Sequence, residues 1–161
     1  MARFEFSLRP GATEVNVLSQ GDLTIVGTEG TVTTKDNPRY SMMVFLSIAF
    51  FLDTLQSFFL RESMRSSRQC TFDGVDGSFE AHILRENKRE YKHMIAIKVF
   101  GNIISREPKD QFIRELWQSV EPFVSLHRAD FKDTDSQAII SDLDVSMREF
   151  AEAFADVLKD N

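Results

Sequence analysis

Residues 70–83 of the chain read CTFDGVDGSFEAHI, and they predict an antiparallel β-hairpin. Apolar and polar side chains alternate on both sides of Asp76-Gly77, a dipeptide typical of a two-residue type I′ turn. Such a turn sets a register in which the apolar residues share one face: Gly74 with Phe79, Phe72 with Ala81, and Cys70 with Ile83. Because a shift of one residue would turn these side chains to solvent, we expect this register and a buried inner face.

The hairpin continues into a third strand. After the polar loop at 87–90, Ile95, Ile97 and Val99 alternate with polar or smaller residues. These three side chains must join the face that carries Phe72 if they are to be buried. We therefore predict a three-stranded meander with strands at 69–75, 78–86 and 91–104.

The segments before the meander predict more strands and one long helix. Short alternating runs indicate strands at 3–9, 14–19, 22–28 and 31–34. The apolar segment MMVFLSIAFFLDTLQSFFL, residues 42–60, lies within a helix predicted at 40–65. Its length and hydropathy would suit a membrane span, but Asp53 lies near its middle, with Gln56 and Ser57 close by. We favour a core helix covered on two sides, with this polar strip reaching one edge.

The last third of the chain predicts two helices, at 108–126 and 138–159. All seven glycines lie at or before residue 101, so a β-rich portion precedes a helical one. We predict a single α+β domain over residues 1–161, an antiparallel sheet with the apolar helix packed on it and two C-terminal helices. The expected core positions are Phe45, Ile48, Leu52, Phe59, Phe72, Phe79, Ile83, Ile95, Ile97, Phe112, Leu116, Phe150 and Phe154.

The charge of the chain is concentrated at its end. Residues 1–129 carry 16 acidic and 16 basic side chains, whereas residues 130–161 carry nine acidic and three basic ones. On a helix, five acids flank the apolar face and form an acidic stripe: Asp142, Glu149, Glu152, Asp156 and Asp160. A negative field repels nucleic acid and favours encounter with a basic protein surface. The stripe is our candidate partner-binding site, and the alternative is a merely solvated helix face.

Two patterns suggest metal sites, and neither is strong. His82 and His93 lie on adjacent predicted strands, but the register turns His82 outward with Glu80 and His93 toward the Ile95 side. Residues 133–144, DTDSQAIISDLD, place oxygen ligands as in an EF-hand loop, yet Ala138 replaces the required glycine and Asp144 the longer glutamate. Asp135 or Ser136 as a helix N-cap explains this stretch better. We predict no bound metal or cofactor.

The sequence contains no nucleophile elbow, phosphate-binding loop, dinucleotide fingerprint or CxxC pair. The single Cys70 alternates with Phe72, which predicts a buried thiol in a reducing compartment. The first residues, MARFEFSLRPG, lack the apolar segment of a secretion signal. We therefore expect a non-catalytic, cytoplasmic protein without nucleic-acid or membrane partners.

The order of elements, with VDGSFEAHILRENKREYKHMIAIKVF at 75–100 and the amphipathic ending MREFAEAFADVLKDN at 147–161, resembles small α+β immunity proteins of bacterial polymorphic-toxin and contact-dependent inhibition systems. The resemblance covers the layout from about residue 40 onward and includes no diagnostic motif. It implies a cytoplasmic protein that neutralises one cognate toxin by occlusion, often with acidic residues facing a cationic active site.

Two other classes of function stay open at this point. The chain is also compatible with a structural or assembly subunit of a homo-oligomer that uses part of the apolar helix. A small-ligand carrier or enzyme, with its site between the sheet and that helix, is the third class. A polar interior cavity would favour this last class.

Overall fold

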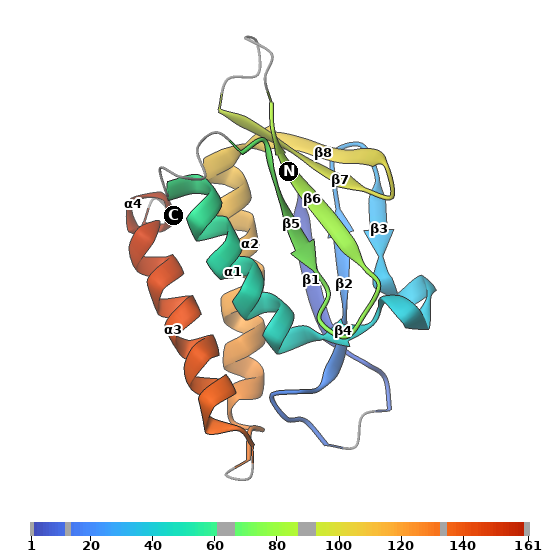
Figure 1. Cartoon of the computed structure of the whole chain (residues 1–161), viewed down its shortest axis with the longest axis vertical. Coiled ribbons are helices and arrows are strands. Elements are labelled where there is room, and N and C mark those ends of the chain that lie inside the picture. Colours follow the sequence, from blue (N-terminus) through green and yellow to red (C-terminus); the bar gives the residue numbers. More distant parts are fainter. Residues whose placement is uncertain (1, 12–13, 61–66, 87–92, 133–134, 160–161) are drawn as a thin grey trace.

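The computed structural model describes residues 2–11, 14–60, 67–86, 93–132 and 135–159. The described residues form two antiparallel sheets, and Figure 1 shows the long helices gathered on one side of them. The α+β class predicted from the sequence is confirmed, but the strands of the described residues form two four-stranded sheets where one sheet was expected.

The first sheet comes from the N-terminal part of the chain. Strands β1 (Arg3–Leu8), β2 (Gln20–Val26) and β3 (Thr31–Thr33) lie in sequence order, and the short β4 (Met42–Met43) also pairs with β2. The predicted strand at 14–19 is wrong. The Asn16 side chain accepts the Leu18 N–H at 2.8 Å, and the Asn16 N–H donates to Ser19 Oγ at 2.9 Å, so local turn bonds replace strand pairing.

The second sheet contains the predicted meander and one further strand. Its order is β5 (Gln69–Asp73), β6 (Glu80–Arg85), β7 (Met94–Val99) and β8 (Asn102–Pro108). The predicted register is confirmed by the pairs Cys70–Ile83, Phe72–Ala81 and Ile83–Ile97. The Gly74 N–H also donates to Phe79 O at 2.9 Å. The Phe72 and Phe79 rings meet edge to face at 6.1 Å, on the buried side.

The turn between β5 and β6 differs from the predicted type I′ turn. Asp76 has a positive φ of 61°, but Gly77 does not share it. The Gly77 N–H donates to Gly74 O at 3.1 Å, and a Cβ on Gly77 would lie 2.5 Å from Ser41 O. Glycine is therefore required at 77 because the turn packs against residues 39–41, rather than for its φ.

Where a single strand was predicted at 91–104, the described residues form a hairpin of β7 and β8. Phe100 and Gly101 have φ values of 51° and 80° and reverse the chain between β7 and β8. A phenylalanine with positive φ is uncommon, so the sequence did not indicate this turn. The Phe100 ring packs against Tyr40 and Phe79, with centroids 5.2 and 6.0 Å apart, and these contacts stabilise the turn.

The two sheets meet where the β2–β3 turn reaches β8. The Glu29 N–H donates to Ile104 O at 2.9 Å, and the Thr28 N–H donates to Ser105 Oγ at 3.2 Å. At Gly27 the approach is closer, since a Cβ there would lie 2.0 Å from Ile104 O. This contact joins the N-terminal half of the chain to the meander.

Helix α1 (Val44–Leu60) is the apolar helix and lies between α3 and β5 (Figure 1). It begins four residues later than predicted because Met42 pairs with Gly21 in β4–β2 and a 3₁₀ turn occupies Pro38–Tyr40. The predicted end at 65 lies outside the described residues. Within the described part of the chain, no helix combines the length and the apolar character needed to cross a bilayer.

The C-terminal helices are α2 (Lys109–Arg128), α3 (Gln137–Ala153) and the short α4 (Ala155–Leu158). Helix α2 packs against β1, where Phe112 meets Phe4 at 5.6 Å. The predicted helix at 138–159 breaks at Phe154, whose φ of −111° and ψ of 25° end α3. One apolar cluster joins both sheets to the helices, and every predicted core residue belongs to it except Phe59, which packs against it partly exposed.

Candidate functional site

A groove of about 520 Å³ runs between α1 and α3. Three carboxylate side chains line it, one from α1 (Asp53) and two from α3 (Asp142 and Glu149). The remaining walls are mixed apolar and uncharged polar: Leu46, Ala49, Phe50, Gln56, Ser57, Val145 and Ser146. We call this feature the acidic groove.

Helical spacing explains why these residues meet. On α1, Leu46, Phe50, Asp53 and Ser57 are three or four residues apart and share the face that the core leaves uncovered. The same spacing on α3 places Asp142, Val145, Ser146 and Glu149 beside its buried face. The α1–α3 packing then brings the two uncovered edges together.

Among the described residues, no cationic side chain pairs with a carboxylate of the acidic groove. Many other carboxylates of the protein do have such a partner. Elsewhere, for example, Arg106 bonds Glu29 at 2.9 Å and Glu86 at 3.0 Å, and Lys132 lies 3.0 Å from Glu14. Asp144, on another face of α3, pairs with Arg128. The groove therefore keeps a local negative charge available to a partner.

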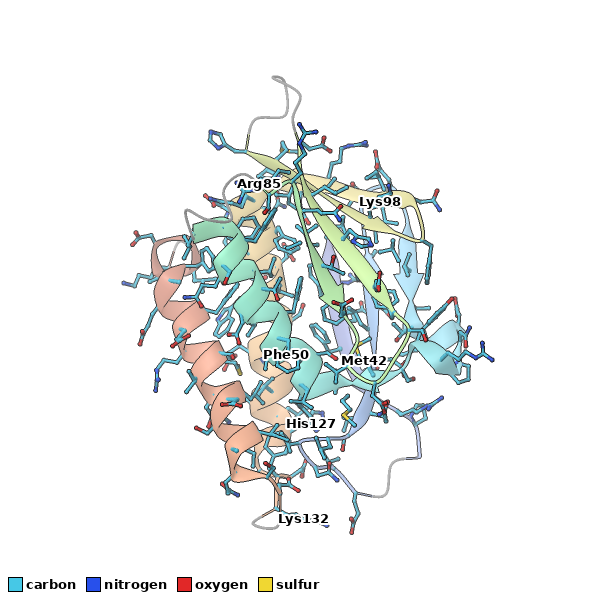
Figure 2. The ribbon with its side chains drawn as sticks, in the orientation of Figure 1. Met42, Phe50, Arg85, Lys98, His127 and Lys132 are labelled. Atoms are coloured by element: carbon cyan, nitrogen blue, oxygen red, sulfur yellow. The ribbon has the colours of Figure 1, made fainter. Side chains whose placement is uncertain are left out.

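Phe50 stands at the rim of the acidic groove, and Figure 2 labels it on α1. Its side chain is 56% exposed, whereas the neighbouring Phe51 is 5% exposed and meets Phe72 at 4.9 Å. Phe50 also lines a second hollow of about 330 Å³ on the other side of α1, beside Thr71 and Asp73 of β5. An exposed aromatic ring therefore lies between two hollows that both contain carboxylates.

The structure divides the predicted acidic stripe. Asp142 and Glu149 line the acidic groove, while Glu152 and Asp156 are exposed farther along, on α3 and α4. Asp160 lies outside the described residues. Asp53 lies on the polar strip predicted at one edge of α1, and that position is confirmed. No pattern in the sequence indicated α3 as the neighbour of that strip, or Phe50 as part of the site.

The outward position predicted for His82 is confirmed, whereas the position predicted for His93 is not. His82 is on the outer face of the second sheet, where Nδ1 lies 3.1 Å from Thr71 Oγ1 and Nε2 lies 3.7 Å from Glu80. His93 is exposed and precedes β7 with a φ of 69°, so its predicted place within a strand is wrong. Across the described residues, no group of three or more His, Cys, Asp or Glu side chains is arranged to hold a metal ion.

The stretch that resembles an EF-hand loop is largely helical. Ser136 caps α3, with its Oγ accepting the Ile139 N–H at 3.4 Å, which confirms the predicted N-cap. Residues from Gln137 onward belong to the helix, so Ser141 and Asp144 do not follow a calcium loop. Asp133, the first ligand position of that pattern, lies outside the described residues.

Cys70 is buried in β5, as predicted, with 6% of its surface exposed. Burial raises the pKa of its thiol to about 12, although the nearby Arg85 charge partly opposes this shift. A thiol that stays protonated is a poor nucleophile. Cys70 is therefore a packing residue.

Comparison of the chain with protein-family models, curated proteins and solved structures finds no match. Any assignment of function must therefore come from the site itself.

Proposed function

We propose that this protein is a non-catalytic binding module whose acidic groove holds a cationic segment of a partner protein. The observation that carries the proposal is the meeting of Asp53, Asp142 and Glu149 in one groove, without a described cationic partner for any of them. Carboxylates arranged in this way accelerate encounter with a basic surface and bind its charges once water is excluded.

The mixed lining of the groove supports a protein partner over a simple ion. Leu46 and Val145 contribute apolar walls, and Phe50 contributes an exposed ring. Protein interfaces commonly combine an aromatic or aliphatic anchor with a polar rim. A cationic amphipathic helix or loop would match both the apolar and the charged parts of this surface.

Self-association through the same groove is less favourable. In a two-fold dimer the same patch faces itself, so the carboxylates of one copy would oppose those of the other. Like charges brought together at an interface cost free energy. The assembly-subunit alternative therefore requires a different surface.

A labelled cationic helix tests the proposal. The probe is a fluorescent amphipathic peptide with lysines on one face and leucines on the other, and its binding is measured by fluorescence anisotropy at increasing NaCl concentration. We expect binding at low salt that weakens as salt rises. The groove variant, Asp53→Asn with Asp142→Asn and Glu149→Gln, should bind at least about tenfold more weakly.

A matched variant separates the groove from overall charge. Glu5→Gln, Glu14→Gln and Asp36→Asn neutralise three exposed acids elsewhere, and either triple changes the formal net charge from −6 to −3. We expect this control to retain its affinity within about twofold. Equal weakening of the two variants, or no binding by the unmodified protein at low salt, would reject the acidic groove as the binding site.

The resemblance to immunity proteins adds a narrower proposal, that the cationic partner is a toxin and that occupancy of its active site neutralises it. Co-expression with a toxin encoded by a neighbouring gene should restore growth of the producing cells. The groove variant should lose this protection while its thermal melt is unchanged. Protection that survives neutralisation of the groove would contradict the narrower proposal.

A further inference from the structure

The ring of Phe50 is strongly exposed and makes no contact with another aromatic ring among the described residues. Phe100 is also 56% exposed, but its ring is packed against Tyr40 and Phe79. For Phe50, no aromatic contact exists within the described part of the chain. The ring is carried by helix α1, whose other face is buried in the core.

Carboxylates surround this ring on two sides. Asp53, one turn farther along α1, lines both hollows that Phe50 separates. Asp142 and Glu149 lie in the acidic groove, and Asp73 lies in the hollow beside β5. A cation over the Phe50 ring would therefore have hydrogen-bond acceptors on either side.

The acidic groove also contains a hydroxyl group. Ser146 lines the groove between Asp142 and Glu149 of α3. Its hydroxyl adds a hydrogen-bond donor and acceptor to the carboxylates on either side.

The two cationic side chains of proteins differ at such a site. The guanidinium group of arginine is planar and weakly hydrated, so it can lie flat on an aromatic ring while its edge N–H groups donate to carboxylates. The ammonium group of lysine is a compact, strongly hydrated point charge, so it gains less from the ring and loses more hydration when it lies there.

Building on the proposed function, we propose that Phe50 makes the acidic groove selective for arginine. The guanidinium stacks on the Phe50 ring and donates to Asp53 and to the carboxylates on either side. Phe50 is thus a specificity-determining residue of the partner-binding surface.

Two peptides that differ only in their cation test this selectivity. Both are the amphipathic helix described above, one carrying lysines and the other arginines at the same positions. We expect the unmodified protein to bind the arginine peptide about threefold to thirtyfold more tightly. Phe50→Leu keeps an apolar side chain but removes the π face, so it should bind the two peptides about equally, with its affinity for the lysine peptide almost unchanged.

Two further variants test whether the aromatic ring at position 50 causes the preference for arginine. Phe50→Trp, which presents a better cation-binding face, should maintain or increase the preference. Phe100→Leu, at an equally exposed phenylalanine outside the groove, should leave it unchanged. Thermal melts of all variants establish that each is folded.

The outcomes distinguish this inference from the function on which it rests. Equal binding of the two peptides by the unmodified protein, lost in the groove variant, would overturn arginine selectivity and leave the proposed function intact. A preference that survives in Phe50→Leu would show that the carboxylates alone select arginine, and would overturn the role of Phe50. Binding of neither peptide would overturn both proposals.

Discussion

Asp53 of α1 and Glu149 of α3 line the same groove, although residues 54–148 separate them in the chain. Both belong to helices whose other faces are buried in the core, so the core packing dictates their proximity. Like charges held together in this way oppose folding slightly and attract a cationic partner strongly. Their location is therefore consistent with the proposed binding function and does not serve stability.

The adjacent phenylalanines of α1 should respond very differently to truncation. Phe51→Ala removes a ring that is 5% exposed and packed on Phe72, and we expect a loss of about 3–5 kcal/mol in the free energy of unfolding. Phe50→Ala truncates a side chain that is 56% exposed and should change that free energy by about 0.5 kcal/mol or less. Chemical denaturation of both variants measures the difference. Similar losses would mean that α1 is rotated relative to the structure described above.

The contact between the two sheets depends on the absence of a side chain at Gly27. A Cβ at this position would lie 2.0 Å from Ile104 O, so Gly27→Ala must push β8 away and should cost about 1–3 kcal/mol of stability. Gly30, at the other end of the same turn, is the control because its Cβ would meet Ile104 at an ordinary 3.7 Å. Gly30→Ala should be nearly neutral in the same unfolding measurement. Equal effects of the two substitutions would contradict the close approach of the sheets.

The buried Glu107 should make the free energy of unfolding depend on pH. The residue is 1% exposed, and burial raises the pKa of its carboxyl, although the Ala2 N–H that donates to Oε2 at 2.9 Å partly opposes the shift. A folded pKa above the unfolded value means that the folded state holds the proton more tightly. The stabilising contribution is therefore complete below the ordinary glutamate pKa of about 4.3 and is lost as pH rises through the higher folded pKa.

Glu107→Gln isolates this contribution because its side chain stays neutral. The unfolding free energy of the variant minus that of the unmodified protein should increase as pH rises from about 4 toward 7. Glu5→Gln, at an exposed position, should give a nearly constant difference over the same range. A constant difference for Glu107→Gln as well would exclude a raised folded pKa.

Cys70 should be protected from thiol reagents in the folded protein. Because burial raises its pKa to about 12, almost no thiolate forms at pH 8, and the side chain is 6% exposed. We expect reaction with a disulfide reagent such as DTNB to be slow in the native protein and rapid in denaturant. The absorbance of the released thiolate follows the reaction. A native rate close to the denatured rate would place Cys70 at the surface.

The features that depend on residues close together in the chain could be predicted from the sequence. Alternation around Asp76 predicted the pairing of Phe72 with Ala81, and helical spacing predicted both the polar strip at Asp53 and the acidic flank at Glu149. These features depend on side-chain periods of two and 3.6 residues, which any stretch of chain displays by itself. The predicted core residues follow from the same periods.

Tertiary packing decided which of these faces meet. No local pattern shows that α3 rather than another element lies beside Asp53, or that the strands divide into two sheets joined at Gly27. The reversal at Phe100 is likewise stabilised by rings from distant parts of the chain. The acidic flank of α3 at Asp142 and Glu149 was therefore predictable from the sequence, but the acidic groove was not, because a groove is made by two elements and its composition depends on how the core orients both.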